Sequence, residues 1–308
     1  MKKLFFLMTF LCAACPFALR AQESTWWGYW NTSMPLQSTT ASSSSGTTVC
    51  AIRLTTANTQ LIDGTLHGLR FWLADKSLVS RAYVWVSARQ FSGDAPDVAM
   101  KELSLDELKD LSHDGAPTVV VFDEAVAVLP STNRYASAYV GYTIETTSAT
   151  PLMAAGADTR IGSNTCFVGW KDQESTRGPL AMQLLVSGPN IAGVGMAVEP
   201  LNETVAMAGQ TLSLPCRFTT VGATVVESID CQVTLDGVAQ PSQRIAFSAP
   251  LDELGLTVEH PLQIAVPAVA KAYDCQVAVT QVNGQPLDSP PSPITHHPSP
   301  ITHHPSPI

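Results

Sequence analysis

The chain contains no apolar run long enough to cross a lipid bilayer. Its longest such run lies near the N-terminus, from Leu4 to Ala14, and covers about eleven residues, whereas a membrane-spanning helix needs about 20. Basic residues are scarce as well, with 17 Lys and Arg against 26 Asp and Glu and a formal net charge of -9. Nucleic acids and anionic membranes select clustered Lys and Arg. The sequence therefore predicts no transmembrane span and no nucleic-acid partner.

The motifs of the common enzyme classes are absent too. The chain has no G-x-S-x-G elbow, no H-E-x-x-H pair, no P-loop and no G-x-G-x-x-G fingerprint. His67, His113 and His260 stand alone beside strands or turns, which favours surface or capping roles. Most Asp and Glu residues lie in turn-like stretches such as "GDAPD", where they cap the backbone. We therefore predict that the protein is not an enzyme and has no catalytic residue, no cofactor and no metal centre.

Residues 1–21 have the composition of an export signal peptide. Lys2 and Lys3 form a basic start, an apolar run follows, and Ala21 is a small residue suited to cleavage before Gln22. The expected location is the cell envelope, at the outer membrane surface or in the periplasm, or the extracellular space.

A second interpretation of the leader is lipoprotein processing at Cys15. The tripeptide Ala13-Ala14-Cys15 resembles such a site, and processing there leaves a lipid anchor on the cysteine. Cys12 and Pro16 fit this pattern poorly, so ordinary cleavage is favoured.

The cysteines of the chain do not define a disulfide framework. The chain has seven cysteines, and five remain after the leader: Cys50, Cys166, Cys216, Cys231 and Cys275. Five is an odd number and no pair has C-x-x-C spacing, so neither a complete disulfide set nor a redox or zinc motif follows. Most of these cysteines lie in apolar strand patterns and are expected to be small buried side chains. The sequence leaves their pairing open.

Short strand-like segments dominate the mature chain, which is long enough for about two domains. Residues 24–190 contain seven segments rich in β-branched and aromatic residues, such as "RAYVWVSA" and "TCFVGW", each bounded by turn residues. This pattern predicts an all-β, jelly-roll-like β-sandwich over 24–190. One short helix is expected in "SLDELKDLS", because Ser104 and Glu107 form a capping box. Leu105, Leu108 and Leu111 then share one helix face.

Residues 197–286 predict a second, immunoglobulin-like β-sandwich. Five segments recur at the spacing of such a module. In "SIDCQVTL" the alternation places Ile229, Cys231, Val233 and Leu235 on one face. In the last strand Cys275 follows the same alternation, and the two cysteines of the shared "DCQV" are candidates for one core. All six tryptophans lie in the first module, so the two modules are expected to differ in fold.

An aromatic cluster, "STWWGYWN", opens the mature chain. Trp26, Trp27, Tyr29 and Trp30 are candidates for a ligand-binding surface, because aromatic planes stack on sugar rings or extended peptides. The alternative, which we favour, is a first strand with its rings in the core. Trp72, Trp85 and Trp170 offer packing partners there.

The C-terminal segment 287–308 is a proline-rich repeat. "SPITHHP" occurs twice and breaks off at "SPI", and two prolines in each unit prevent a continuous helix. His296, His297, His303 and His304 are candidates for a weak metal site, since imidazole binds Zn²⁺ and Cu²⁺. The expected state is a disordered tail.

The segments "WWGYWN", "CAIRL", "LHGLRFWL", "AYVWVS" and "AYVGYTIE" carry a resemblance to a known family. Together they resemble the N-terminal module of exported Bacteroidetes surface proteins related to outer-membrane protein 28. The stretch "VEPLNETVAMAGQTLSLPCRF" is similar to the cell-adhesion-related, immunoglobulin-like modules that follow it. The resemblance implies an envelope location and a binding or scaffolding role. It also implies a downstream thioredoxin-like domain, in whose place this chain has the tail repeat.

The leading functional prediction is a non-enzymatic, exported protein that acts in binding, adhesion or as a structural stalk, with a surface protein or glycan as an unidentified partner. One alternative is the accessory N-terminal half of a truncated outer-membrane enzyme or thioredoxin-like protein. The other is a carbohydrate-binding module that uses Trp26, Trp27, Tyr29 and Trp30.

Overall fold

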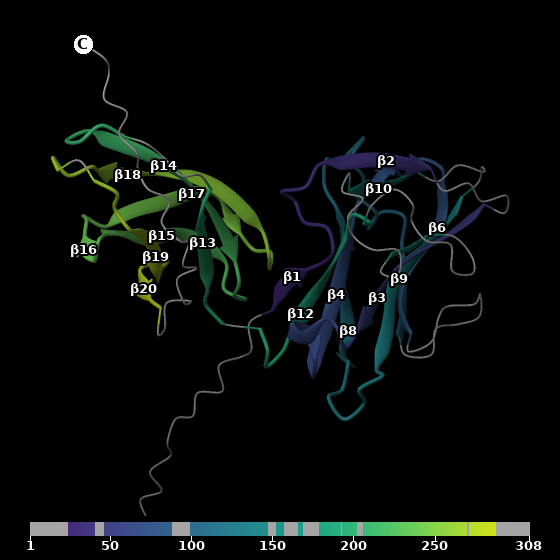
Figure 1. The fold of residues 1–308 in the computed structure, drawn as a ribbon. Helices are drawn as coiled ribbons and strands as arrows, with labels where there is room; N and C mark the ends of the chain where they lie inside the picture. The colour runs from purple at the N-terminus through teal and green to yellow at the C-terminus, as the bar shows by residue number, and fades with distance from the viewer. Residues whose placement is uncertain are drawn as a thin grey trace, which may run out of the picture.

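The computed structural model describes residues 24–40, 46–87, 99–146, 152–156, 166–168, 179–191, 193–201, 206–269 and 271–287. These residues form strands joined by turns, with one short 3-10 turn at Thr59–Leu61. The strands build two β-sandwiches, one from each half of the chain (Figure 1). The predicted all-β sandwich fold is confirmed. No helix in the described part of the chain is long and apolar enough to cross a membrane.

The first module has two main antiparallel sheets that enclose one core. One sheet has the strand order β1-β12-β4-β8 and the other β11-β3-β9-β6-β7, while β2, β10 and β5 form a smaller third sheet. The strand bounds are β1 (Thr25–Trp27), β2 (Leu36–Thr40), β3 (Thr47–Thr55), β4 (Gly64–Phe71), β5 (Leu73–Asp75), β6 (Val79–Ser87), β7 (Ala99–Leu103), β8 (Thr118–Val128), β9 (Ser137–Thr146), β10 (Leu152–Gly156), β11 (Cys166–Val168) and β12 (Met182–Ser187). Inward-facing aliphatic side chains from both main sheets meet in the core.

Gly141 in β9 lets the Trp85 ring and the backbone of β3 lie close to the strand. A Cβ atom added at this position would lie 2.2 Å from the Cys50 carbonyl oxygen and 2.8 Å from the Trp85 ring. The missing side chain lets the buried Trp85 indole lie across the sheet, where its Nε1 donates to Thr143 Oγ1 at 3.1 Å. A close approach of this kind is the usual reason for glycine inside a strand.

The predicted helix at residues 104–111 is wrong. The capping box does form, since the Ser104 N–H and hydroxyl both donate to Glu107 Oε2, at 2.7 and 2.8 Å. After one turn, however, the chain turns away and the Leu111 N–H bonds the Leu73 carbonyl at 2.9 Å. Leu108 is buried whereas Leu105 is 49% exposed, so the leucines share no face. Pairing with β5 outcompetes a helix too short to be stable alone.

The second module is a smaller sandwich with immunoglobulin-like strand order. One sheet is β13-β14-β18, and the other is β16-β15-β19-β20 with β17 also paired to β15. The bounds are β13 (Met196–Pro200), β14 (Thr211–Thr220), β15 (Val226–Leu235), β16 (Val238–Ala239), β17 (Gln243–Leu251), β18 (Thr257–Ala265), β19 (Cys275–Val282) and β20 (Gln285–Pro286). The predicted alternation in β15 is confirmed, because Ile229, Cys231, Val233 and Leu235 are all buried.

The register of β15 and β19 excludes a bond between Cys231 and Cys275. Cys275 lies opposite Leu235 and Cys231 opposite Val279. Four residues of strand separate the two cysteines by about 13 Å, whereas a disulfide needs Cα atoms within about 7 Å. Burial raises the pKa of the Cys216 and Cys231 thiols to about 12, so they behave as core hydrophobes. The side chain of Cys166 lies outside the described residues.

Two glutamine side chains cap the edge of β18. Gln240 donates its amide to the Ala265 carbonyl at 2.7 Å and accepts from the Ala265 N–H at 3.0 Å. Gln243 makes the same pair of bonds with Gln263, at 2.7 and 2.8 Å. The two amides take the place of a neighbouring strand and satisfy an otherwise open sheet edge.

Candidate functional site

The structure separates the four aromatic residues of the N-terminal cluster. Trp27 belongs to the main core and is 6% exposed, and Trp30 is 1% exposed in a separate cluster with Trp72, their ring centres 4.6 Å apart. Tyr29 is partly buried against Trp27 and bonds Asn58. Trp26 lies at the junction of the modules. The four rings therefore do not form one surface on which a sugar could stack. Trp27 and Trp30 instead pack inside the first module.

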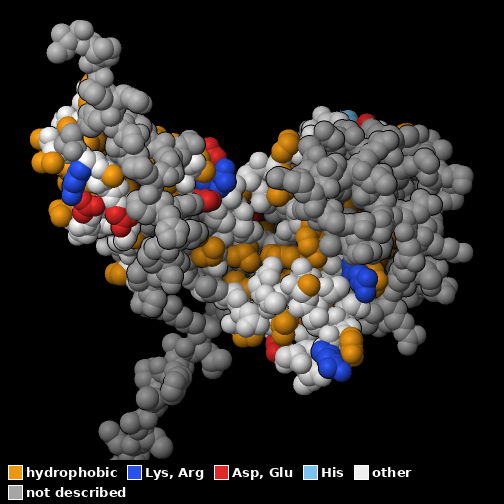
Figure 2. Space-filling model, in the orientation of Figure 1, with side chains coloured by type: hydrophobic (Ala, Val, Ile, Leu, Met, Phe, Trp, Pro, Cys, Tyr) orange, Lys and Arg blue, Asp and Glu red, His pale blue; other side chains and the backbone are white. Residues whose placement is uncertain are grey.

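The junction of the modules is built around Trp26 and the segment that follows β17. The Trp26 carbonyl accepts from the Leu254 N–H at 2.8 Å, and Trp26 pairs with Glu253 in a parallel bridge. The Arg70 guanidinium stacks on the Trp26 ring, 4.4 Å from its centre. Figure 2 shows hydrophobic side chains gathered where the two modules meet. The N-terminal strand thus joins the first module to the second.

Glu253 is the charged centre of this junction and is only 2% exposed. Its carboxylate accepts from Arg70 at 2.8 Å, from the Thr32 hydroxyl and N–H at 2.7 and 2.9 Å, and from Gln183 at 3.0 Å. Burial lowers the pKa of Arg70, and the negative charges of Glu253 and Asp252 oppose that shift. Every donor near the carboxylate comes from the first module. The network holds the modules together and leaves no vacant ligand position among the described residues.

Asp75, Asp110 and His113 form a titratable cluster that sequence reasoning missed. His113 was expected to stand alone, but potential ligand atoms of all three residues lie within 4.8 Å of one another. Asp110 is buried and accepts from the N–H groups of Lys76 and His113 at 2.8 and 2.7 Å, and it contacts His113 Nδ1 at 2.8 Å. These bonds occupy both carboxylate oxygens. The cluster is a turn-forming network, and we assign no metal to it.

The Asp110 network predicts a pH-dependent stability. Burial by itself would raise the pKa of Asp110, but the hydrogen bonds from His113 and Lys76 outweigh it and lower the pKa from 3.8 to about 2. Ionised Asp110 therefore stabilises the fold above pH 4, and this contribution is lost as the pH falls toward 2. The hydrogen bond and the charge of Asp110 raise the pKa of His113. The contribution of protonated His113 to stability is therefore present below the ordinary histidine pKa and is lost as the pH rises through the raised value.

Replacing Asp110 with Ala is expected to lower the free energy of unfolding by about 1.5–3 kcal/mol, the value of a hydrogen bond to a charged group. Urea unfolding between pH 2 and 8 measures this. The two curves should converge near pH 2, and a constant difference over the whole range contradicts the assignment.

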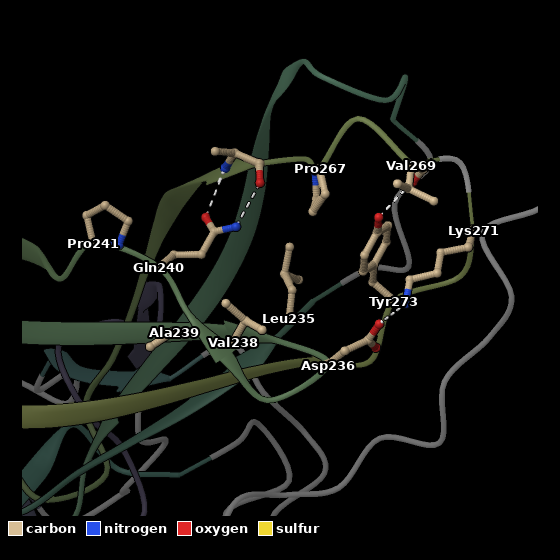
Figure 3. A pocket seen from close by; sticks show the side chains of 11 residues that line it. Leu235, Asp236, Val238, Ala239, Gln240, Pro241, Pro267, Val269, Lys271 and Tyr273 are labelled. Carbon is tan, nitrogen blue, oxygen red and sulfur yellow. Dashed lines mark hydrogen bonds and ion pairs between the residues drawn. The ribbon is translucent and has the colours of Figure 1, made fainter.

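A groove opens at one end of the second module, between β16 and the end of β18. Its cavity volume is about 550 Å³, within the range of small-ligand sites. Figure 3 shows Leu235 and Tyr273 projecting toward Pro267. Val238 and Val269 line the walls and are 70% and 65% exposed. These two valines make the walls of the groove apolar and open to solvent.

The charged groups of the groove lie on one side of it, and the Gln240 amide lies on the other (Figure 3). Lys271 Nζ pairs with Asp236 Oδ2 at 2.5 Å and lies 4.9 Å from the centre of the Tyr273 ring. The bond from Lys271 lowers the pKa of Asp236, and the same pair raises the pKa of Lys271, so both stay charged around neutral pH. The Tyr273 hydroxyl donates to the Val269 carbonyl at 2.7 Å, which fixes the ring (Figure 3). The groove thus combines a fixed aromatic ring, an apolar floor and one ion pair.

The remaining predicted sites lie elsewhere or are not described. Residues 1–23, including Cys15, and the tail histidines at 296, 297, 303 and 304 lie outside the described residues. His67 bonds Ser187, and His260 is close to its neighbour's carbonyl. Tyr273 was not among the predicted site residues. The signal available in the sequence was "VPAVAKAY", an apolar stretch with one lysine that ends in an aromatic residue.

No family model matches the chain, and no curated protein matches it. Among solved structures, the chain is similar to the glycoside hydrolase domain of Endo-D from Streptococcus pneumoniae R6, with 13% sequence identity and a TM-score of 0.22. The match covers 80% of this chain and 28% of that one, so the chain spans less than a third of the enzyme domain's length.

The predicted adhesion or structural role has no counterpart in this comparison, whose matched structure is a glycoside hydrolase domain. That prediction is withdrawn. A TM-score of 0.22 is too low to transfer a fold or an activity, and neither is assigned to this chain from the match.

Proposed function

We propose that the second module binds carbohydrate in the groove beside β16. The observation that carries this proposal is the fixed Tyr273 ring beside an apolar floor and the Asp236–Lys271 pair. A sugar ring has one face of C–H groups, which packs on an aromatic or aliphatic surface, and hydroxyls around its rim. Those hydroxyls suit a carboxylate and an ammonium group, which accept and donate hydrogen bonds. The groove offers both kinds of surface at once.

The proposed activity is binding and not cleavage. Glycoside hydrolysis needs two carboxyl groups, one on each side of the scissile bond. Asp236 is the carboxyl that the groove lining offers, and Lys271 already neutralises it. The proposed site also differs from the N-terminal aromatic cluster, because Trp27 and Trp30 are buried.

We further propose that the protein acts outside the cytoplasm, because residues 1–21 are predicted to be a signal peptide. Mass spectrometry of the protein recovered from its own cells tests this. A mature N-terminus at Gln22 supports export, and an intact Met1 contradicts it.

Replacing Tyr273 with Ala is expected to weaken glycan binding by about 10- to 100-fold, since burial of an aromatic face contributes roughly 1.5–3 kcal/mol. Tyr273→Phe keeps the ring and loses only the bond to Val269, so it should retain most of the affinity. A glycan array followed by titration of the best ligand measures both variants. Tyr135→Ala in the first module, where the ring is 78% exposed, is the matched control. Unchanged binding by Tyr273→Ala, or no glycan bound by the unmodified protein, contradicts the proposal.

A further inference from the structure

The turn between β15 and β16 places a carboxylate at the end of the groove. Leu235 pairs with Val238, so Asp236 and Gly237 are the two residues of a tight hairpin loop. Both have positive φ angles, 50° and 77°, and Asp-Gly is a preferred pair for a loop with this backbone. The turn thus fixes the position of the Asp236 carboxylate, which points toward Lys271 (Figure 3).

Asp236 joins this turn to the segment that carries Lys271 and Tyr273. Its N–H donates to the Asp274 carbonyl at 2.8 Å, and its Oδ1 accepts from the Asp274 N–H at 2.8 Å. Its Oδ2 accepts from Lys271 Nζ at 2.5 Å. Each carboxylate oxygen therefore has one partner within the protein and keeps a second lone pair for a ligand hydroxyl.

The charges of Asp236 and Lys271 cancel within the groove. Of the lining residues that the structure describes, Lys271 is the one cation and Asp236 the one acid. Their side chains are 52% and 35% exposed, so solvent screens part of the attraction between them. The bond between them nevertheless lowers the pKa of Asp236 and raises the pKa of Lys271. Both side chains are ionised around pH 7, and the groove carries no net charge there.

The Lys271 ammonium group can serve a neutral ligand better than an acidic one. It has three N–H donors, and Asp236 occupies one of them. The other two can donate to sugar hydroxyls. A sulfate or carboxylate group on a ligand would be attracted by Lys271 and repelled by Asp236 beside it, and the formal net charge of -9 adds to the repulsion. A neutral sugar meets no such repulsion.

We propose that the groove selects neutral glycans over acidic ones, and that Asp236 sets this preference by neutralising Lys271. This inference rests on the carbohydrate-binding function proposed above and adds the chemical class of the ligand. Asp236 is then the residue that determines specificity. Tyr273 supplies affinity for both classes, because neutral and acidic sugars share the C–H face that packs on its ring.

Matched glycans test the selectivity of the unmodified chain. The probes are the neutral glycan that binds best on an array and the same glycan with one sulfate at different positions, each titrated against the full chain. None of the sulfated forms is expected to bind more tightly than the neutral form. A sulfated form that binds tighter by about 5-fold or more, the effect of one exposed charge contact, overturns this proposal and leaves the carbohydrate-binding function intact. Binding of no glycan at all overturns both.

Asp236→Asn is expected to reverse the preference. Asparagine tolerates the positive φ angle, and its amide oxygen can still accept from the Asp274 N–H, but it leaves Lys271 without a counter-charge. At least one sulfated form should then bind about 5-fold more tightly than the neutral form. The difference should shrink in high salt, which screens exposed charges. The ratio of the two affinities is the measured quantity, because a loss of folded protein weakens binding of both forms equally.

Two further variants separate this charge effect from a change in the fold or in the overall charge. Glu227→Gln is the matched control, because Glu227 is exposed on β15 about 26 Å of strand away from Leu235 and carries the same charge. Its affinity ratio should equal that of the unmodified chain. Lys271→Met leaves Asp236 without its cation, so at least one sulfated form should bind about 5-fold more weakly relative to the neutral form.

The variants together decide the proposal even if one of them does not fold, which thermal melting shows. An unchanged affinity ratio in every folded variant of Asp236 and Lys271 overturns it. A change in Glu227→Gln as large as that in Asp236→Asn also overturns it, since the effect would then come from the overall charge.

Discussion

Replacement of Glu253 by Ala is expected to loosen the two modules and to lower the free energy of unfolding by about 3–5 kcal/mol, the usual cost of removing one partner from a buried ion pair. The variant leaves Arg70 in the junction, 11% exposed, with Asp252 as its remaining acid at 3.6 Å. It also removes the acceptor for the Thr32 N–H and hydroxyl. Calorimetry should show one transition for the unmodified chain and two for the variant.

A double variant shows whether the stability of the junction depends on the charges of Arg70 and Glu253 or on the packing of their side chains. Arg70→Met with Glu253→Leu removes both charges and keeps similar volumes, and such replacements are often neutral or stabilising. The double variant is therefore expected to recover much of the lost stability. Small-angle scattering measures the separation of the modules in each protein. If Glu253→Ala melts and scatters as the unmodified chain does, the junction does not depend on this pair.

Replacement of Trp30 by Ala is expected to lower the free energy of unfolding by about 3–5 kcal/mol, as for other fully buried aromatic residues. The indole is 1% exposed and packs edge-on against Trp72. Met34, Leu36 and Leu111 close the cluster around the pair. The cavity left by the ring cannot collapse without moving Trp72. Chemical denaturation followed by tryptophan fluorescence measures the change.

The same variant tests the alternative that the N-terminal aromatic residues bind a ligand. If Trp30 served only a ligand surface, its removal would leave stability unchanged and weaken glycan binding. The structure predicts the opposite pattern, with Tyr273→Ala as its counterpart: a loss of binding with a smaller loss of stability, because Tyr273 is only partly buried against the core. Tyr135→Ala, which removes a highly exposed ring, should change neither property.

The strands could be predicted because their pattern is local. Alternation of side chains with a period of two placed Cys231 and Val233 in a core, and β15 confirms it. The helix at residues 104–111 failed for a tertiary reason. Ser104 and Glu107 made the expected capping box, but Leu111 paired with β5, which the local sequence does not reveal.

The sites could not be predicted in the same way, because their residues are distant in the chain. Arg70 and Glu253 are 183 positions apart, and Val238 and Tyr273 line one groove only because β16 and β19 both pair with β15. His113 was taken for an isolated residue although its partner Asp110 is three positions away, because the sequence does not show that Asp110 is buried and that Asp75 of β5 lies beside it. The resemblance to outer-membrane surface proteins remains a prediction, since no family model matches the chain.

By itself, the sequence determined the all-β class, because strand propensity and alternation are carried by neighbouring residues. The tertiary structure alone decided that three of the four N-terminal aromatic residues belong to the first module's packing and that Trp26 holds the junction. It also decided that Gln240 and Gln243 cap the edge of β18. Those outcomes depend on contacts between strands far apart in the chain, and such contacts have no local signature.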